Sequence, residues 1–196
     1  LTGRRNPAER RRRMIEAACE LIPEVGVNGL THRLVAARAG VPLGATTYYF
    51  ASLDDLVAAA LARAAEVTEE ALRLWNEVLE RCEDVPATLA ALTAEYLRER
   101  DRMVTWNELY AAAAHRPELR PLARLWLDGL TRSLSGHAGE RAARAAAVFV
   151  DGALLYSLIN DEPLDTESLE RSLAALLGMD APRARGHEPT GATPPA

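Results

Sequence analysis

The sequence predicts an all-α fold, and three observations support this prediction. Apolar residues recur three and four positions apart along most of the chain, for example at Met14, Ala17, Ala18 and Leu21, which is the period of a helix with one buried face. Helix-start signals, in which a capping side chain precedes proline or an acidic residue, occur repeatedly. No stretch alternates apolar and polar residues for long enough to suggest a strand.

Composition narrows the class of protein further. The 196 residues suffice for one large domain or for a small domain joined to a medium one, and the hydrophobic share of 48 % allows a core. The sequence shows no signal peptide, and apolar runs such as residues 56–62 are too short to cross a bilayer. The two cysteines lack the spacing of a disulfide framework or a metal site. These features predict a cytoplasmic protein with no membrane partner, cofactor or metal.

Charge is distributed unevenly along the chain. Residues 1–50 hold eight arginines and four acidic residues, a net of +4. The remaining residues hold 15 arginines and 24 acidic residues, a net of −9, which gives the overall charge of −5. A basic N-terminal part on an acidic body predicts that the N-terminal part meets a polyanion.

Start and stop signals set the expected helices. Asn6 caps a first helix that Gly26 ends, and Pro23 is expected to kink or shorten its last turn. Ser52, with Asp55 three residues later, caps a long fourth helix. A polar link is expected at 135–139, and the proline-rich residues 180–196 are predicted to form a disordered tail. The helices are expected at about 6–26, 31–39, 42–50, 52–81, 84–100, 101–115, 117–135, 140–160 and 166–177.

The second and third of these helices are short, and Gly40 joins them. This arrangement predicts a helix-turn-helix whose later helix enters the major groove of DNA. In that helix Thr46 and Phe50 share one face, so at least one of Tyr48 and Tyr49 points outward, where its hydroxyl can bond a phosphate. We expect one tyrosine to anchor the small domain and the other to meet DNA. The alternative is an aromatic helix end that is merely buried against a neighbour.

The segment THRLVAARAGVPLGATTYYFASLDDL, residues 31–56, resembles the DNA-binding signature of the tetracycline-repressor (TetR) family of bacterial transcription regulators. The shared features are the opening threonine, the Ala-Gly-Val turn, the aromatic pair before phenylalanine, and the serine before an acidic helix start. With the preceding helix, the resemblance covers residues 8–56. It implies a three-helix DNA-binding domain at 1–51 and a helical effector-binding and dimerisation domain at 52–179.

The resemblance also implies residues that contact DNA. They are Thr31, Arg33, Gly44, Ala45, Thr47, Tyr48 and Tyr49. Thr47 and Leu53 depart from the family pattern, which usually has tyrosine and lysine there, and the basic residue near Leu43 is missing. The recognition helix is therefore uncharged, which leaves Arg33 as the nearby candidate for reading guanine.

Sequence-independent attraction to DNA is expected to come from other arginines. The candidates are Arg4, Arg5 and the cluster at residues 10–13. If these side chains touch the backbone, each phosphate neutralised contributes about −0.9 to the log–log salt slope. The alternative for the cluster is a solvated helix face.

Two apolar rows predict the seam of a homodimer. One lies at 117–135 and the other at 140–160; they comprise Leu119, Leu122, Trp126, Leu130 and Leu134, and Ala142, Ala146, Phe149, Ala153 and Tyr156. A dimer places two recognition helices about 34–36 Å apart, or a multiple of this, and so predicts a palindromic operator in double-stranded DNA. The alternative is that both rows face their own core.

Aromatic and polar residues on the middle helices predict a mostly apolar pocket for a small-molecule effector. The candidate lining residues are Tyr96, Arg100, Met103, Trp106, Asn107, Tyr110 and Trp126, with Trp75 as a wider wall. The same residues would suit an ordinary core equally well.

Catalysis finds little support in the sequence, which has no glycine-rich phosphate loop and no G-x-S-x-G elbow. We therefore expect no enzyme, but a sequence-specific transcription regulator, a repressor whose operator binding is altered by a small molecule in the helical domain. The alternative is a helical protein-interaction adaptor without an effector, against which the basic N-terminal part argues.

Overall fold

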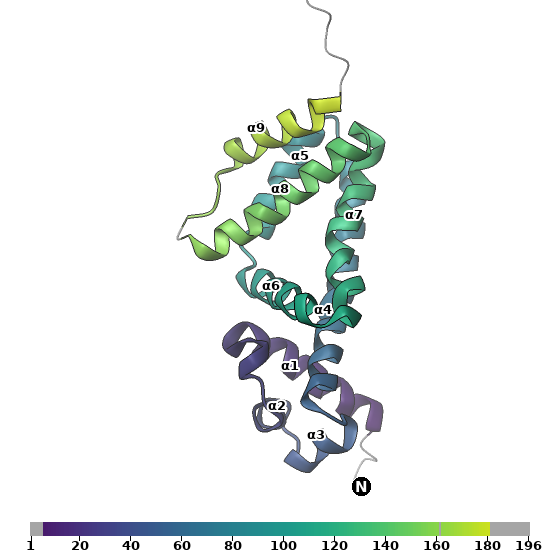
Figure 1. Ribbon diagram of the computed structural model, residues 1–196, viewed down its shortest axis with the longest axis vertical. Coiled ribbons are helices and arrows are strands. Elements are labelled where there is room, and N and C mark those ends of the chain that lie inside the picture. Colours follow the sequence, from purple (N-terminus) through teal and green to yellow (C-terminus); the bar gives the residue numbers. More distant parts are fainter. Residues whose placement is uncertain (1–5, 161, 181–196) are drawn as a thin grey trace, which may run out of the picture.

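The computed structural model describes residues 6–160 and 162–180, and within them the chain is helical with no strand (Figure 1). The elements are α1 (Pro7–Gly29), α2 (His32–Ala39), α3 (Leu43–Tyr49), α4 (Leu53–Leu79), α5 (Val85–Tyr96), α6 (Arg100–His115), η1 (Pro117–Leu119), α7 (Arg120–Ala138), α8 (Glu140–Ile159), α9 (Thr166–Leu177) and η2 (Gly178–Asp180). The all-α prediction is confirmed. The predicted tail at 180–196 lies outside the described residues except for Asp180.

Two parts follow one another along the long axis of the molecule (Figure 1). The head consists of α1 to α3, and the body consists of α4 to α9. Helix α4 begins beside α3 and continues unbroken into the body, where it packs against α7. Helix α6 crosses the middle of the molecule and packs against α1, so that it forms the floor of the body above the head.

The ends of the head helices follow the predicted signals. The Asn6 side chain accepts a hydrogen bond from the Ala8 amide at 3.1 Å, which caps α1. Gly26 has φ 71° and ψ 166°, so the regular helix breaks at the predicted residue although the conformation is not left-handed helical. Ser52 and Asp55 form the predicted capping box at the start of α4, with bonds of 3.1 and 3.0 Å.

The predicted link at 135–139 is wrong, because α7 continues to Ala138 and only Gly139, with φ 79°, separates it from α8. Burial of Leu130 and Leu134 holds the helix through this polar stretch. The Ser135 hydroxyl adds a bond to the Thr131 carbonyl at 2.6 Å. The helix expected to run to residue 100 ends earlier, at Tyr96.

Most residues of the two apolar rows expected to form the dimer seam are buried within their own subunit. Leu119, Trp126, Leu130 and Leu134 are at most 4 % exposed, and Ala142, Ala146 and Ala153 at most 2 %. The reason is that α7 and α8 pack against each other, and this contact buries the larger apolar face of each helix. Tyr156 of the second row is 42 % exposed, and a homodimer through the helices at 117–135 and 140–160 stays a prediction.

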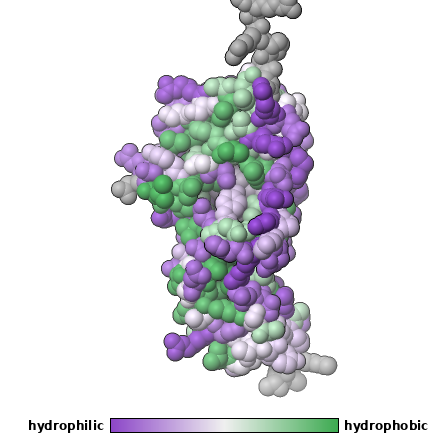
Figure 2. All heavy atoms as spheres, viewed as in Figure 1, coloured by the Kyte–Doolittle hydropathy of each residue, from purple (hydrophilic) through white to green (hydrophobic). Residues whose placement is uncertain are grey.

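Helix α8 keeps a second apolar face outside the core. Val148, Gly152, Leu155 and Ile159 recur at helical spacing along it and are all exposed, Ile159 at 74 %. Figure 2 shows apolar atoms gathered over this end of α8. By length and composition alone α8 could cross a membrane, contrary to the expectation from shorter apolar runs, but it packs against α7 and α9 within the body.

Candidate DNA-binding surface and ligand cavities

The turn between α2 and α3 is fixed by local backbone chemistry. The Thr31 hydroxyl accepts a hydrogen bond from the Leu34 amide at 3.2 Å and so caps α2. Gly40 ends the helix in the left-handed conformation, with φ 62° and ψ 43°, which favours glycine. The Arg13 guanidinium donates to the Ala39 carbonyl, so α1 also supports the end of α2.

Helix α3 has one buried face and one exposed face. Thr46 is fully buried, and its hydroxyl donates to the Leu43 carbonyl at 2.7 Å. Phe50 is buried directly after the helix. On the opposite side lie Gly44 and Thr47, both exposed, which places two small residues on the outer surface.

The two adjacent tyrosines take different roles. Tyr48 is 82 % exposed and points away from the head, whereas Tyr49 is half-buried against the core. Their rings meet edge to face, with centroids 5.1 Å apart, so the anchored ring supports the exposed one. The structure thus agrees with the expectation that one tyrosine is anchored, and it identifies Tyr48 as the outward one.

Several arginines near this surface contact other parts of the head. Arg12 pairs with Glu9 at 2.8 Å and with Glu16 at 3.0 Å. Arg11 lies over the Phe50 ring, 5.1 Å from its centroid. These contacts favour the solvated-face interpretation for part of the cluster at residues 10–13; Arg4 and Arg5 lie outside the described residues.

On α2, two arginines differ in their surroundings. Arg38 pairs with Glu24 at 2.8 Å and with Glu20 at 3.4 Å, and its hydrogen bond lowers the pKa of Glu24. Arg33 is exposed and forms no ion pair within the described residues. Arg33 is therefore the α2 arginine that is available to a new partner.

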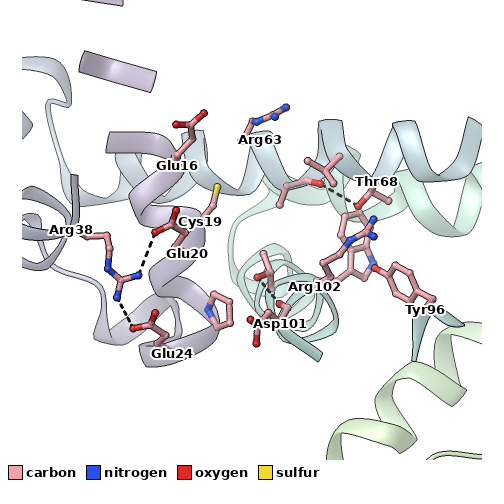
Figure 3. Close-up of a pocket in the computed structure, with 15 residues that line it drawn as sticks. Glu16, Cys19, Glu20, Glu24, Arg38, Arg63, Thr68, Tyr96, Asp101 and Arg102 are labelled. Carbon is pink, nitrogen blue, oxygen red and sulfur yellow. Dashed lines mark hydrogen bonds and ion pairs between the residues drawn. The ribbon is translucent and has the colours of Figure 1, made fainter. Parts of the chain in front are cut away.

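A cleft separates the head from the body (Figure 3). Its volume is about 580 Å³, and we call it the head–body cleft. Helix α1 contributes one wall, including Cys19 and Glu20, while Tyr96, Arg102 and Thr68 lie on the other side. The Arg102 guanidinium lies over the Tyr96 ring, 5.0 Å from its centroid. Acidic side chains such as Glu20 and the basic Arg102 therefore line the head–body cleft. The aromatic rings of Tyr96 and Trp106 line it too.

Cys19 in this cleft is not a reactive thiol. It donates a hydrogen bond to the Ala60 carbonyl at 3.2 Å, and burial raises the pKa of the thiol to about 11. The thiolate is the nucleophilic form, so this environment disfavours reaction. Cys19 is partly buried and packs against the core.

A second cavity, of about 230 Å³, lies between α6 and α8, and we call it the Asp151 cavity. The Tyr110 hydroxyl donates to Asp151 Oδ1 at 2.9 Å. Burial raises the pKa of Asp151, opposed by this hydrogen bond, and burial together with the Asp151 charge raises the pKa of Tyr110. A single hydrogen bond, from Tyr110, therefore offsets only part of the effect of burial on the Asp151 carboxylate.

The predicted effector residues do not share one pocket. Trp106 borders both cavities, Tyr96 only the head–body cleft, and Arg100 lies in a separate cavity near the end of α8. Trp126 is 1 % exposed and stacks on Tyr96 at 5.3 Å, so it is a core residue and not a pocket wall. The remaining predicted residues, Met103, Asn107 and Tyr110, line the Asp151 cavity.

Sequence reasoning missed Asp151 itself. It is the sole acidic residue between 141 and 160, in a helix that is otherwise rich in alanine and branched apolar residues. An isolated acid on an apolar helix is a signal that could have found it. Trp106 also borders this cavity, and its buried indole nitrogen meets no hydrogen-bond acceptor within the described residues.

A helix-turn-helix head on a helical body with cavities defines a DNA-binding transcription regulator, and comparison with known proteins specifies the family. Residues 14–60 match the model for "Bacterial regulatory proteins, tetR family", and residues 80–179 match "Tetracyclin repressor-like, C-terminal domain". The chain belongs to the TetR family. The resemblance inferred from the sequence is confirmed.

Relatives extend over nearly the whole chain. The HTH-type transcriptional regulator BetI of Escherichia coli O157:H7 is 30 % identical over 80 % of this chain and 86 % of its own length. BetI 1 of Chromohalobacter salexigens is 27 % identical over 93 % of this chain and 96 % of its own length. The chain is accordingly a transcription regulator of this kind and not an enzyme.

Solved structures agree with this assignment. A TetR family member from Streptomyces coelicolor A3 is 40 % identical, with a TM-score of 0.76, over 86 % of this chain and 98 % of that one. The multidrug binding protein EbrR complexed with ethidium is 40 % identical, with a TM-score of 0.74, over the same shares. Regulators of this family bind DNA as dimers and respond to small molecules.

Proposed function

We propose that this protein represses transcription by laying the exposed face of α3 in the major groove of its operator. The observation that carries the proposal is the 82 % exposure of Tyr48 on a helix whose opposite face is buried. An exposed phenol beside two small residues, Gly44 and Thr47, can approach the duplex closely and bond a phosphate oxygen. Because α3 carries no charge, base recognition rests on hydroxyl groups and methyl packing.

The edge of this surface is completed by α2 and the start of α3. Thr31 and Arg33 supply contacts to phosphate, and Arg33 also reaches a base edge. Ala45, partly exposed, packs against a thymine methyl. Tyr49 is half-buried, so its contribution is chiefly to hold Tyr48, with only its hydroxyl available to the backbone of DNA.

The dimer is formed through the outward face of α8. Its exposed row of Val148, Gly152, Leu155 and Ile159 is the kind of apolar face that a second copy of the chain would cover. Gly152 leaves room for close approach of the partner helix, since nothing lies within 4 Å of its Cβ position. Two copies would present two α3 helices to a palindromic operator. This face lies on the helix at 140–160, one of the two helices expected to form the dimer.

The effector binds in the head–body cleft. The protein acts in the cytoplasm. The cleft's volume of about 580 Å³ lies in the range of about 300–1,000 Å³ that is usual for ligand sites. Its walls come from the head on one side and the body on the other, so a ligand there changes how α1 sits on α6. The EbrR structures contain imidazole, malachite green, proflavin or ethidium, which supports a small-molecule effector for this chain too.

A gel-shift assay with the DNA upstream of the coding region tests the proposal. At low salt we expect a complex of one dimer per palindrome, weakened at higher salt because phosphate contacts release counterions. A dimer that binds no fragment of that DNA at either salt concentration, while remaining folded, would instead favour a helical adaptor.

A further inference from the structure

Leu43 opens α3 with a large apolar side chain that the head leaves in solvent. It is 52 % exposed, whereas Val41, two residues earlier, and Tyr49, at the end of the helix, are partly buried and pack against the core. A single exposed leucine is ordinary on a protein surface, so exposure alone assigns it no role. Its position does, because α3 lies at the end of the molecule away from the body and carries the proposed DNA contacts (Figure 1).

Leu43 is continuous with the outer face of α3. Leu43 and Thr47 are four residues apart in the helix, so their side chains lie on the same side. Gly44 and Tyr48 are related in the same way, one position further along, and all four residues are exposed. Ala45 is partly buried and lies two positions after Leu43, which places it on another side of the helix. The face proposed to meet DNA therefore includes a leucine that can enter the groove.

This face has no side chain that reads a base through paired hydrogen bonds. Residues 43–49 include no arginine, lysine, asparagine, glutamine or acidic residue, the types that pair with base edges in the major groove. Both threonine hydroxyls already donate within the helix, Thr46 to the Leu43 carbonyl at 2.7 Å and Thr47 to the Gly44 carbonyl at 3.3 Å. The surface that remains for recognition is mainly apolar. The apolar group that the major groove offers is the C5-methyl group of thymine.

We propose that Leu43 contacts the C5-methyl group of a thymine in each half-site of the operator and so helps to select that base pair. The inference rests on the proposed docking of α3 in the major groove, and it names the base feature that the helix reads. Burying the methyl group against the leucine removes apolar surface of both partners from water, which favours binding. Cytosine carries a hydrogen atom where thymine has its methyl group, so the contact would be lost at a C·G pair.

Deoxyuridine isolates the methyl group, since it differs from thymidine at C5 alone and pairs with adenine in the same way. Thymines of the palindromic fragment are replaced in symmetry-related pairs, and fluorescence anisotropy measures the affinity of the full-length protein for each duplex. Burial of one methyl-sized group corresponds to about fourfold in a binding constant, so its loss from both half-sites should weaken binding about tenfold or more at one pair of positions. If no replacement changed the affinity by more than about twofold, the proposal would be overturned.

A variant then assigns the methyl contact to Leu43. In Leu43→Ala the side chain is truncated at a half-exposed position, so the fold should survive. At the sensitive positions this variant should bind the thymine and deoxyuridine duplexes within about twofold of each other, while its response at the other thymines stays that of the parent. Leu74→Ala on α4 is the matched control, since Leu74 is 51 % exposed and lies in the body, and it should discriminate as the parent does. Parental discrimination retained in Leu43→Ala would overturn the assignment to this residue.

Binding to the unmodified fragment is scored separately, so the failure of one idea can be told from the failure of the other. A protein that binds its operator but responds to no deoxyuridine replacement contradicts only the methyl contact. A folded, dimeric protein that binds no DNA contradicts the docking of α3 and, with it, the methyl contact.

Discussion

The Val27 amide donates a hydrogen bond of 2.7 Å to the Glu108 carboxylate, which ties the end of α1 in the head to α6 in the body. The two residues are 81 positions apart in the sequence. The bond forms directly after Gly26, where the backbone of α1 leaves its helical path. The orientation of the head is therefore linked to the helix that also borders the head–body cleft and the Asp151 cavity.

Replacing Glu108 with alanine should loosen this connection. The Val27 amide would lose its acceptor, and we expect the free energy of unfolding to fall by about 1–2 kcal/mol. Chemical denaturation followed by circular dichroism measures the change. Glu118→Ala, which removes an exposed carboxylate from η1, is the control and should have little effect. An equal loss of unfolding free energy in both variants would show that the Val27–Glu108 hydrogen bond does not stabilise the fold.

Gly44 offers a test that separates stability from DNA binding. Nothing lies within 4 Å of its Cβ position, so Gly44→Ala should raise the free energy of unfolding by about 0.5–1 kcal/mol through helix propensity. Its operator affinity should nevertheless fall, because the added methyl group stands between α3 and the duplex. Gly136→Ala on α7, also with nothing within 4 Å, should stabilise the protein without weakening DNA binding. Unchanged operator affinity in Gly44→Ala would remove Gly44 from the contact surface.

The salt dependence of operator binding distinguishes Arg33, which forms no ion pair within the described residues, from Arg12, which does. Arg33→Ala should reduce the log–log salt slope of operator binding by about 0.9, because one phosphate contact is lost. Arg12→Ala should change that slope less, since Arg12 already pairs with Glu9 and Glu16. Fluorescence anisotropy at several salt concentrations gives both slopes. The opposite order would mean that the α1 cluster, and not α2, meets the phosphates.

Protonation of Asp151 should set part of the pH dependence of stability. Burial raises its pKa above the unfolded value, so its contribution to stability is present at acid pH and is lost as pH rises through the folded-state pKa. Asp151→Asn cannot ionise and should be more stable than the parent at neutral pH, with the difference vanishing in acid. Thermal melting at several pH values measures this difference.

Asp165 provides a control of opposite sign. The backbone amide of Ser168 donates to its carboxylate at 2.8 Å and lowers its pKa, so its contribution to stability is present above the unfolded pKa and lost in acid. Asp165→Asn should therefore lose stability relative to the parent as pH rises. If Asp151→Asn were more stable than the parent by the same amount at every pH, the charge of Asp151 would not be the cause of the stability difference.

Local signals in the sequence were sufficient for most helix starts and for the turn between α2 and α3. Asn6 and Ser52 cap helices as expected, because a cap depends on groups within three residues of one another. Gly40 adopts the left-handed turn that its place between α2 and α3 requires. The outward position of Tyr48, in contrast, follows only once the buried face of α3 is known.

Contacts between segments that are far apart in the sequence could not be predicted from it. The Tyr110–Asp151 bond joins residues 41 positions apart, and no period or motif specifies which helices meet. For the same reason the sequence did not show that most residues of the apolar rows on α7 and α8 would be buried within their own subunit. Periodicity identifies an apolar face but not the surface that covers it.

Operator affinity of Tyr48→Ala, measured by fluorescence anisotropy on a palindromic fragment, tests the central claim most directly. The side chain is 82 % exposed, so its removal should leave the melting temperature nearly unchanged. We predict a loss of at least about tenfold in affinity, or about 1.4 kcal/mol. A folded, dimeric variant that binds the fragment as tightly as the parent would contradict the docking of α3 on DNA.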